Sequence, residues 1–303
     1  MLCLEEVSKG FKQKQLLKKL SFTVPSSGIH GFIGANGAGK TTTFKLILGL
    51  LPIEEGAIYV AGERVIYGQT NRSQTVGYLP DVPSFYPYMT ATSYLKLCAA
   101  IAQVPRQQQE DLCERLLQQV GLAQVGQQKI RSYSRGMKQR LGIAQALINR
   151  PKLLLCDEPT SALDPQGRKE VHELLTSLKE EMTIVMSTHL LSDAEQVCDS
   201  IIMLNNGAIT LSNRLSTIYE RYQTQVIVLN FTNTTNAKDC AEALDASDWC
   251  VVTQQSEQVS LNVATITSGY PRVIAWLHGH PQFMPALTIA TPTLEDIFME
   301  VVQ

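Results

Sequence analysis

One segment constrains this chain more than any other feature. It reads Gly34-Ala35-Asn36-Gly37-Ala38-Gly39-Lys40-Thr41 and fits the pattern G-x-x-x-x-G-K-[ST]. An apolar run over residues 29–33 precedes it and reads as a strand, and a helical pattern over residues 40–51 follows it and stops at Pro52. A glycine-rich turn between a strand and a helix predicts a phosphate site, because backbone N–H groups and the positive end of the helix surround one space.

Two side chains of this segment supply further chemistry. Lys40 provides a positive charge for the β and γ phosphates of a nucleotide. The Thr41 hydroxyl is a hard oxygen ligand of the kind that Mg²⁺ binds. The segment therefore predicts a nucleotide held together with a magnesium ion.

Short apolar runs alternate with helical patterns up to about residue 215. Residues 153–156 and 183–186 read as strands, and a helix near 166–181 lies between them. Residues 201–204 and 209–211 flank Asn206-Gly207 and predict a hairpin. Strands that alternate with helices of this length predict a largely parallel sheet.

Two further regions differ in their pattern of predicted helices and strands. Between residues 83 and 150, helical patterns over 91–102, 107–120 and 137–148 follow one another without a strand, which predicts a helical insertion. In residues 216–303, strand-like runs at 226–229, 259–263 and 273–276 precede a capping box, Thr293-Leu294-Glu295-Asp296, that opens a last helix. We therefore predict the α/β class: a P-loop NTPase core with a parallel sheet over 1–215, a helical insertion, and a small α+β tail over 216–303.

Composition excludes several classes of protein. Hydrophobic residues make up 44% of the chain, which excludes wholesale disorder. The net charge of -2 offers no basic face for nucleic acid. No apolar run approaches the roughly 18 residues of a membrane span, and residues 1–10 do not form a secretory signal. The seven cysteines contain no CxxC pair, which indicates free thiols in a reducing cytosol.

Three acid–base residues follow the predicted strands. Asp157 and Glu158 come directly after the apolar run at 153–156, at the strand end where parallel sheets bind ligands. Asp157 can hold Mg²⁺ directly or through a water, and Glu158 can polarise the water that attacks the γ-phosphate. His189 follows the strand at 183–186 on the same edge, where it either donates to the γ-phosphate or orients the attacking water.

The order of phosphate loop, Asp-Glu strand and strand-end histidine resembles the ATP-binding subunit of ABC transporters. The segment Tyr133-Ser134-Arg135-Gly136-Met137 stands where that family usually has Leu-Ser-Gly-Gly-Gln. Ser134 and Gly136 match, whereas Arg135 and Met137 depart from the pattern. Ser134 and Gly136 lie just before a predicted helix at Met137, which makes a second anion-binding helix terminus. The resemblance implies that two subunits stack head to tail and that each signature closes over the ATP of the other.

The resemblance also assigns three single residues. Asp164, in Ser161-Ala162-Leu163-Asp164, resembles the loop that crosses between the two subunits, although a turn before the next helix explains it equally. Phe11 stands where the family has an aromatic ring that stacks on adenine, and a core phenylalanine is the alternative. Asp81 follows Gly77-Tyr78-Leu79-Pro80 in place of the usual glutamine and is still a suitable magnesium ligand.

The expected site falls into four groups of residues. The catalytic group is Lys40, Glu158 and His189. The ATP-binding group is Phe11, Gly34, Ala35, Asn36, Gly37, Ala38, Gly39, Lys40, Thr41, Thr42, Asp81 and Asp157. The group that contacts the partner's ATP is Ser134, Arg135, Gly136 and Asp164. The magnesium ligands are Thr41, Asp81 and Asp157.

The resemblance further implies partners and a location. The segment Pro292-Thr293-Leu294-Glu295-Asp296-Ile297-Phe298 and the variant signature look like the branch of single-domain ATPases that pair with separate membrane permeases, often exporters of drugs, antibiotics or lipids. A second ATP-binding subunit, a separate integral membrane permease and a peripheral position on the cytoplasmic face of the cell membrane are then expected. The aromatic residues Phe85, Tyr86 and Tyr88 lie where the family docks its permease, or they pack the insertion against the core.

Three alternatives remain beside this interpretation. A soluble ABC ATPase of DNA repair would insert long coiled coils between Asp81 and Ser134, and one of translation would carry two ATP domains. A binding module that uses ATP without turnover would not need both Glu158 and His189. A P-loop kinase would not need the signature at Ser134.

Overall fold

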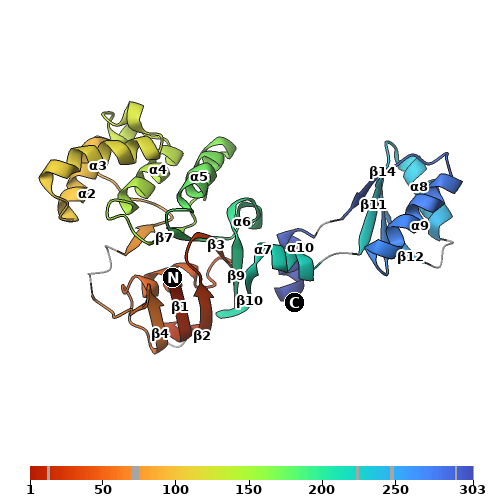
Figure 1. The fold of residues 1–303 in the computed structure, drawn as a ribbon, viewed down its shortest axis with the longest axis horizontal. Helices are drawn as coiled ribbons and strands as arrows, with labels where there is room; N and C mark the ends of the chain where they lie inside the picture. Colours follow the sequence, from red (N-terminus) through yellow and green to blue (C-terminus); the bar gives the residue numbers. More distant parts are fainter. Residues whose placement is uncertain (12–13, 70–74, 223–224, 246–248, 291, 303) are drawn as a thin grey trace. The chain divides into compact units, whose positions relative to one another are not determined.

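The computed structural model describes the chain except for residues 12–13, 70–74, 223–224, 246–248, 291 and 303. It divides into two compact units, which are described separately. The first comprises Met1–Thr217 with Phe298–Gln303, and the second comprises Ile218–Ile297 (Figure 1).

A six-stranded sheet forms the centre of the first unit. Its order is β10 (Ala208–Arg214), β9 (Ser200–Asn205), β3 (Gly28–Ile33), β8 (Thr183–Thr188), β7 (Leu153–Asp157) and β6 (Val76–Leu79). All neighbouring pairs are parallel except the hairpin of β9 and β10, so the predicted parallel sheet and hairpin are confirmed. Every residue of β7 and β8 is buried, which explains why both sequences read as continuous apolar runs.

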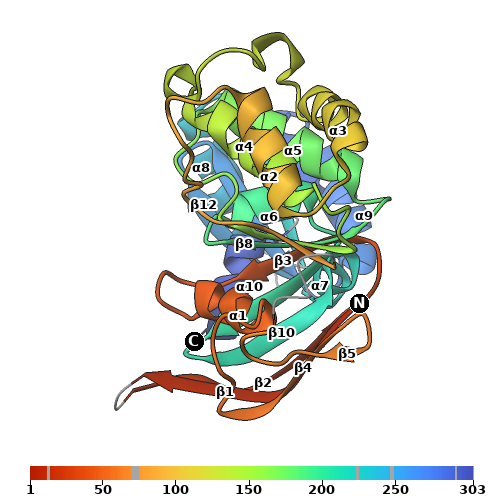
Figure 2. The same ribbon diagram turned by 90° about the vertical axis from the view of Figure 1, so that its left-hand side faces the viewer.

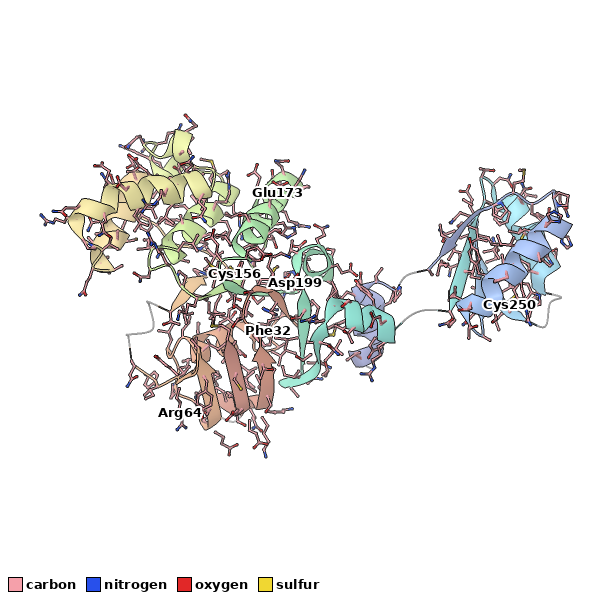
Figure 3. All side chains as sticks on the ribbon, viewed as in Figure 1. Phe32, Arg64, Cys156, Glu173, Asp199 and Cys250 are labelled. Atoms are coloured by element: carbon pink, nitrogen blue, oxygen red, sulfur yellow. The ribbon has the colours of Figure 1, made fainter. Side chains whose placement is uncertain are left out.

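A second, antiparallel sheet covers part of this core and was not predicted from the sequence. Its order is β2 (Lys14–Val24), β1 (Leu2–Phe11), β4 (Glu55–Val60) and β5 (Glu63–Arg64). Helix α1 (Lys40–Ile47) contributes Phe44 to the core, where Phe32 has its ring centre 5.7 Å from Phe22 and 6.0 Å from Phe44 (Figure 3). The helix ends earlier than residue 51, because Gly49 adopts a left-handed backbone with φ of 69°.

Helices form the rest of the first unit. They are α2 (Ala91–Ile101), α3 (Arg106–Gln119), η2 (Ala123–Val125), η3 (Ile130–Ser132), α4 (Arg135–Ala146), α5 (Pro165–Leu178) and α6 (Leu191–Val197). Helix α7 (Leu215–Arg221) begins in the first unit and continues into the second. Figures 1 and 2 show α2, α3, α4 and α5 gathered on the opposite side of the central sheet from β1, β2 and β4. No strand lies between residues 83 and 150, all of which are described, and the helices expected there are present.

The second unit is a β-α-β-β-α-β arrangement. Its elements are β11 (Val226–Asn230), α8 (Thr234–Asp245), β12 (Cys250–Gln255), β13 (Gln258–Val263), α9 (Ile266–Gly279) and β14 (Ala286–Ile289). The strands form an antiparallel sheet in the order β12-β13-β11-β14, and Figure 1 shows α8 and α9 on one face of it. This order is that of the split βαβ motif.

The structure corrects one strand prediction in this region. Residues 273–276 lie in helix α9, which begins after Thr265, whose hydroxyl accepts a hydrogen bond from the Ser268 N–H at 3.2 Å. Gly269 and Val273 are buried four residues apart, which is a helical spacing that a four-residue window does not reveal.

The capping box at the end of the chain is confirmed. Helix α10 (Leu294–Val302) follows Thr293, whose hydroxyl accepts from the Asp296 N–H at 3.2 Å. The Asp296 carboxylate in turn accepts from the Thr293 N–H at 2.9 Å. Two backbone donors at the helix start are therefore satisfied reciprocally.

Candidate functional site

The glycine-rich segment joins β3 to α1 and forms the floor of a pocket. Nine residues line this pocket: Leu16, Asn36, Gly37, Gly39, Lys40, Thr41, Thr42, Asp81 and Glu158. Gly37 and Gly39 have φ values of 80° and 114°, which glycine adopts without strain. A Cβ at Gly39 would lie 2.5 Å from a methyl carbon of Leu17 on β2, so a larger residue there would push the loop away from that strand.

Lys40 is the buried cation of the pocket. Only 6% of the residue is exposed, and its Nζ donates to the Gly34 carbonyl at 2.7 Å. The same Nζ lies 3.1 Å from Glu158 Oε1. The ammonium group is thus aimed along the loop toward the carboxylate, in the space that a phosphate group would share.

Asp157 ends β7 and is held from two sides. Its Oδ2 accepts from the Thr41 hydroxyl at 2.7 Å, and its Oδ1 accepts from the Ser187 hydroxyl at 2.5 Å. Ser187 was not predicted, although it lies opposite Asp157 in the register of β7 and β8. A carboxylate that is fully buried and doubly bonded keeps one orientation, as a metal ligand or water-holding group requires.

Glu158 has an unusual backbone that directs its side chain into the pocket. Its φ is 49°, which costs a non-glycine residue about 1–2 kcal/mol. Its N–H donates to the Ser187 carbonyl at 3.1 Å, and this bond anchors the turn. Glu158 Oε2 lies 2.8 Å from His189 Nδ1, so the structure brings together the acid and the histidine that the sequence placed on one sheet edge.

Asp81 lines the same pocket with an unsatisfied carboxyl oxygen. Its Oδ1 is buried and has no hydrogen-bond partner. Burial raises the pKa of the Asp81 carboxyl, and the negative charges of Glu158 and Asp157 raise it further. Tyr78, which was not predicted, has its phenol pKa raised by burial and then by Asp157. The Asp81 carboxyl is thus influenced by two other negative charges, which favours a cation beside it.

The oxygen donors at this place fit a magnesium ion. Thr41 and Asp81 line the pocket, and Asp157 accepts a hydrogen bond from the Thr41 hydroxyl, so that three hard oxygen ligands lie beside the loop. Among the described residues, no cluster of three or more His, Cys, Asp and Glu side chains is arranged to hold a metal by itself. Mg²⁺ usually keeps several waters and takes ligands from substrate phosphates, so an incomplete protein shell is what this ion requires.

Comparison with known proteins decides the family. The family model described as "ABC transporter" matches residues 17–161. The uncharacterised ABC transporter ATP-binding protein YxlF of Bacillus subtilis (strain 168) is 39% identical over 230 residues, which cover 76% of each chain. This chain belongs to the ABC transporter ATP-binding proteins. It is therefore an ATP-binding and ATP-hydrolysing subunit of an ABC transporter.

Two further similar proteins are relevant to transport and to assembly. The bacitracin transport ATP-binding protein BcrA of Bacillus licheniformis is 37% identical over 206 residues, 67% of this chain and 66% of that protein. A dimeric structure of the ATP-binding cassette MJ0796 in a post-hydrolysis state, bound to ADP and phosphate, aligns with a TM-score of 0.64 and 25% identity, over 71% of this chain and 99% of that one.

The signature residues of this ABC subunit cap a helix. Ser134 is the N-cap of α4, and its hydroxyl accepts from the Met137 N–H at 3.1 Å. The helix begins at Arg135 rather than Met137, so Gly136 lies in its first turn instead of before it. Asp164 caps α5 in the same way and accepts from the Gly167 N–H at 3.0 Å. None of these residues lines the phosphate pocket of its own chain, and their contacts with a partner's ATP stay predictions.

Phe11 also lies outside the residues that line the phosphate pocket. It ends β1 with 47% of its surface exposed, and the Lys9 ammonium lies 5.4 Å from the centre of its ring. An exposed ring is not a core phenylalanine, so the alternative of a buried structural role is wrong. Stacking on adenine stays a prediction.

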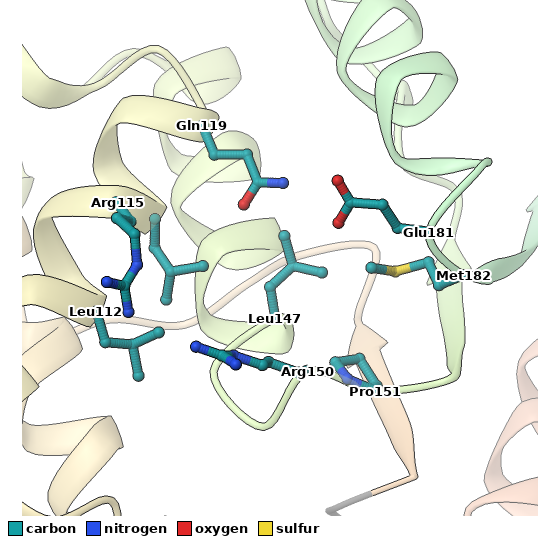
Figure 4. Close-up of a pocket in the computed structure, with 9 residues that line it drawn as sticks. Leu112, Arg115, Gln119, Leu147, Arg150, Pro151, Glu181 and Met182 are labelled. Carbon is teal, nitrogen blue, oxygen red and sulfur yellow. The ribbon is translucent and has the colours of Figure 1, made fainter. Parts of the chain in front are cut away.

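A separate pocket of this subunit lies away from the phosphate loop (Figure 4). It is lined by Leu112, Arg115, Leu116, Gln119, Leu147, Arg150, Pro151, Glu181 and Met182, from α3, the end of α4 and the turn before β8. It shares no residue with the phosphate pocket, and its apolar floor is bordered by two guanidinium groups and one carboxylate.

Proposed function

We propose that this protein powers export through a separate membrane permease, working as a dimer on the cytoplasmic face of the cell membrane. The bacitracin transport protein BcrA supports the direction, because it is similar over two thirds of both chains. No helix of the described residues has the length and apolar character needed to cross a bilayer. In this proposal the transmembrane path is supplied by another chain.

The observation that carries this proposal is the convergence of two groups of side chains in one pocket. The loop with Lys40 cradles phosphates, and the pair of Glu158 and His189, 2.8 Å apart, faces the same space. A site that only binds nucleotide needs the first group and not the second. The arrangement therefore supports turnover of ATP rather than its use as a clamp.

Nucleotide binding rearranges one contact in particular. Lys40 Nζ lies 3.1 Å from Glu158, and a γ-phosphate competes for this ammonium group. Once Lys40 binds the phosphate, the Glu158 carboxylate is free to accept a proton from the attacking water. His189, bonded to the other oxygen of Glu158, orients that carboxylate and donates toward the γ-phosphate.

Magnesium completes the site when it is bound. A bound Mg²⁺ would supply positive charge that neutralises the phosphates of the nucleotide. Thr41 and Asp157 are its first ligands in this proposal, with Asp81 as the third. Ser187 keeps the Asp157 carboxylate turned toward Thr41 through its 2.5 Å hydrogen bond.

The second copy closes the site. Ser134 and Gly136 lie at a helix N-terminus outside the phosphate pocket of their own chain, and Asp164 caps a neighbouring helix. In a head-to-tail dimer these groups cover the γ-phosphate of the partner's ATP. Hydrolysis places charge on both products and releases the two copies.

The test is purification of the full chain with its membrane partner. We expect a tagged protein carrying Glu158→Gln to retain a polytopic membrane protein in equal amount when it is purified from detergent-solubilised membranes with ATP. The parent pair is expected to hydrolyse ATP in lipid vesicles, and the variant pair is not. A parent that binds ATP but retains no membrane protein under these conditions would contradict the proposal.

A further inference from the structure

The proposed base Glu158 lies on a turn with an unusual backbone. Its φ is 49°, and that of Ala162 in the same turn is 51°. The turn is closed by the Ser161 N–H, which donates to the Glu158 carbonyl at 3.1 Å, and by the Leu163 N–H, which donates to the Thr160 carbonyl at 3.2 Å. Non-glycine residues keep a positive φ only where the surrounding structure holds the backbone in place. The turn that carries Glu158 therefore needs an anchor outside itself.

The side chain of Thr160 supplies such an anchor. Its hydroxyl donates to Asp193 Oδ2 at 2.5 Å, across 33 residues of chain, and each of the two residues is only 1% exposed. A hydrogen bond to an ionised acceptor is about twice as strong as one between neutral groups. Loss of this bond would leave a polar group buried without its partner, which is costly. The link thus fixes the turn firmly to α6.

The carboxylate of Asp193 does not serve its own helix. Asp193 lies in the first turn of α6, where acidic side chains often accept from free backbone N–H groups. No side chain caps this helix, and the Asp193 N–H is already bonded to the Leu190 carbonyl at 3.2 Å. The carboxylate is instead turned toward the segment that follows β7. Its role therefore lies between the two segments and not within α6.

The same two segments meet a second time in the phosphate pocket. Glu158 precedes Thr160 by two residues, and His189 precedes Asp193 by four. Glu158 Oε2 lies 2.8 Å from His189 Nδ1, but the His189 side chain is 37% exposed. Water competes for an exposed contact, so such a contact holds its geometry weakly by itself. The buried bond of Thr160 and Asp193 is the firmer of the two links and sets the spacing of the other.

We propose that Thr160 and Asp193 are positioning residues for ATP hydrolysis. Their buried hydrogen bond keeps the Glu158 carboxylate beside His189, in the orientation in which it accepts a proton from the attacking water. Neither side chain lines the phosphate pocket, so both act through Glu158 and His189 and not by touching the nucleotide. The inference rests on the proposed catalytic role of Glu158. A displacement of about 1 Å in a reacting group costs up to about 10²-fold in rate.

A purely structural role is the alternative that an experiment must separate. Arg168 and His172 on α5 lie 3.6 Å from the Asp193 carboxylate, which is beyond hydrogen-bond distance. They surround Asp193 and join α5 to α6. A cluster that only packs these helices together would change the stability of the unit and leave the turnover number alone. The decisive readout is therefore kcat, measured apart from KM and from stability.

Two substitutions of Thr160 test the proposal in the full chain. Thr160→Val replaces the hydroxyl by a methyl group of similar size, and Thr160→Ser keeps the hydroxyl. Phosphate release is measured over a range of Mg-ATP concentrations. Thr160→Val is expected to lower kcat by about tenfold to a hundredfold and to leave KM within about twofold of the parent. Thr160→Ser is expected to retain most of the parent kcat. A parent kcat in Thr160→Val, or an equal loss in both variants, would overturn the proposal.

Thr183→Val is the matched control. Thr183 is also 1% exposed, and its hydroxyl accepts from the Ser27 N–H at 2.9 Å. It begins β8, whereas His189 follows the other end of that strand. Thr183→Val is expected to lower the thermal midpoint as Thr160→Val does, because each removes one buried hydrogen bond, and to keep the parent kcat. If kcat falls equally in both variants, the loss follows stability, and the positioning role is wrong.

A double variant shows whether Thr160 acts through Glu158. Glu158→Gln with Thr160→Val is expected to hydrolyse ATP as slowly as Glu158→Gln alone, because the group that Thr160 positions is already lost. Single-turnover measurements with labelled ATP follow these slow rates. A further loss as large as that in the parent background would overturn the proposal. Hydrolysis by Glu158→Gln alone at the parent rate would instead refute the proposed catalytic role, which separates the two failures.

Asp193→Asn keeps the proposal testable if Thr160→Val does not fold. The asparagine side chain has almost the same shape, but it offers the Thr160 hydroxyl a neutral acceptor that is about half as strong as a carboxylate. We expect kcat to fall by about tenfold with KM for ATP unchanged. A kcat equal to that of the parent in this variant would overturn the proposal.

Discussion

The two units of this ABC subunit differ in what they bury. The buried polar and charged residues of the described chain all lie in the first unit, and they include Lys40, Asp157 and Ser187 of the ATP site. The buried side chains of the second unit are apolar, as in the cluster around Leu261. Burying a polar group costs free energy unless it is hydrogen-bonded, so the buried side chains of the first unit need specific partners, whereas those of the second unit need only apolar neighbours.

The first unit also contains a second buried polar cluster, which surrounds Asp193. Asp193 on α6 accepts from the Thr160 hydroxyl at 2.5 Å and lies 3.6 Å from both Arg168 and His172. Thr160 follows the catalytic Glu158 by two residues, and Asp193 follows His189 by four. The cluster therefore ties together the two segments that meet in the active site.

The largest expected effect is on catalysis. Glu158→Gln removes the proton acceptor and is expected to slow ATP hydrolysis by about 10²–10⁴-fold, the usual contribution of a general base. Phosphate release under saturating Mg-ATP measures it. Glu173→Gln is the matched control, because Glu173 is exposed on α5 (Figure 3) and forms an exposed ion pair with Lys169. Hydrolysis by Glu158→Gln at the parent rate would show that this role is wrong.

The next largest effect is on the stability of the second unit and leaves the ATP site unchanged. Leu261→Ala empties part of the core of the second unit and is expected to lower the free energy of unfolding of that unit by about 2–5 kcal/mol. ATP affinity, measured with a fluorescent nucleotide, is expected to stay at the parent value. A loss of nucleotide binding would show that the ATP site depends on the core of the second unit, which contradicts this separation.

Removal of the buried Asp193 carboxylate on α6 is expected to lower the free energy of unfolding by a smaller amount, which depends on pH. Burial raises the pKa of Asp193, but the nearby His172 side chain, the hydrogen bond from the Thr160 hydroxyl and the charge of Arg168 outweigh it and leave this pKa lowered. Asp193→Ala is expected to cost about 1.5–3 kcal/mol at neutral pH. A lowered pKa stabilises the fold above the ordinary Asp value of about 3.9, and this is lost as the pH falls through the folded-state pKa.

Denaturant titrations at several pH values measure this difference between parent and variant. It is expected to be constant near neutrality and to shrink in acid. A difference that grows in acid would contradict the assigned ionisation of Asp193.

The smallest expected effect is a gain in stability, on removal of the Asp81 carboxylate. The pKa of Asp81 is raised by burial and by the charges of Glu158 and Asp157, so its ionised form destabilises the fold above that raised pKa. Asp81→Asn is expected to raise the thermal midpoint of the nucleotide-free protein at pH 8, and the gain is expected to shrink as the pH falls toward about 4. A gain that is equal at both pH values would place its cause outside the charge of Asp81.

The difference between the polar ATP site of the first unit and the apolar core of the second also explains what could be predicted from the sequence. Lys40, Thr41, Asp157 and Glu158 were predictable because phosphate chemistry fixes residue types at short spacings. Ser187 was not, since a serine at a strand end is common and only the register of β7 and β8 sets it beside Asp157. In the second unit apolar runs alone gave the signal, and such runs do not distinguish a helix from a strand over four residues.

The antiparallel sheet of the first unit shows a further limit. Its strands mix charged and apolar residues around bulges, as at Leu4, Val7 and Lys9, which interrupts the alternation of period two. Pairing partners such as β1 and β4 are also separated by a phosphate loop and a helix. Local pattern does not report contacts of this kind, so they require the tertiary structure.

The most direct measurement of the central claim is the molar mass of the Glu158→Gln protein by light scattering with saturating ATP and Mg²⁺. We expect the mass to double from the 33.5 kDa of one chain, and a further Lys40→Ala substitution, which removes the phosphate-binding charge, to return it to that value. An ATP-loaded protein that stays at the mass of one chain, with and without its membrane partner, would contradict the account.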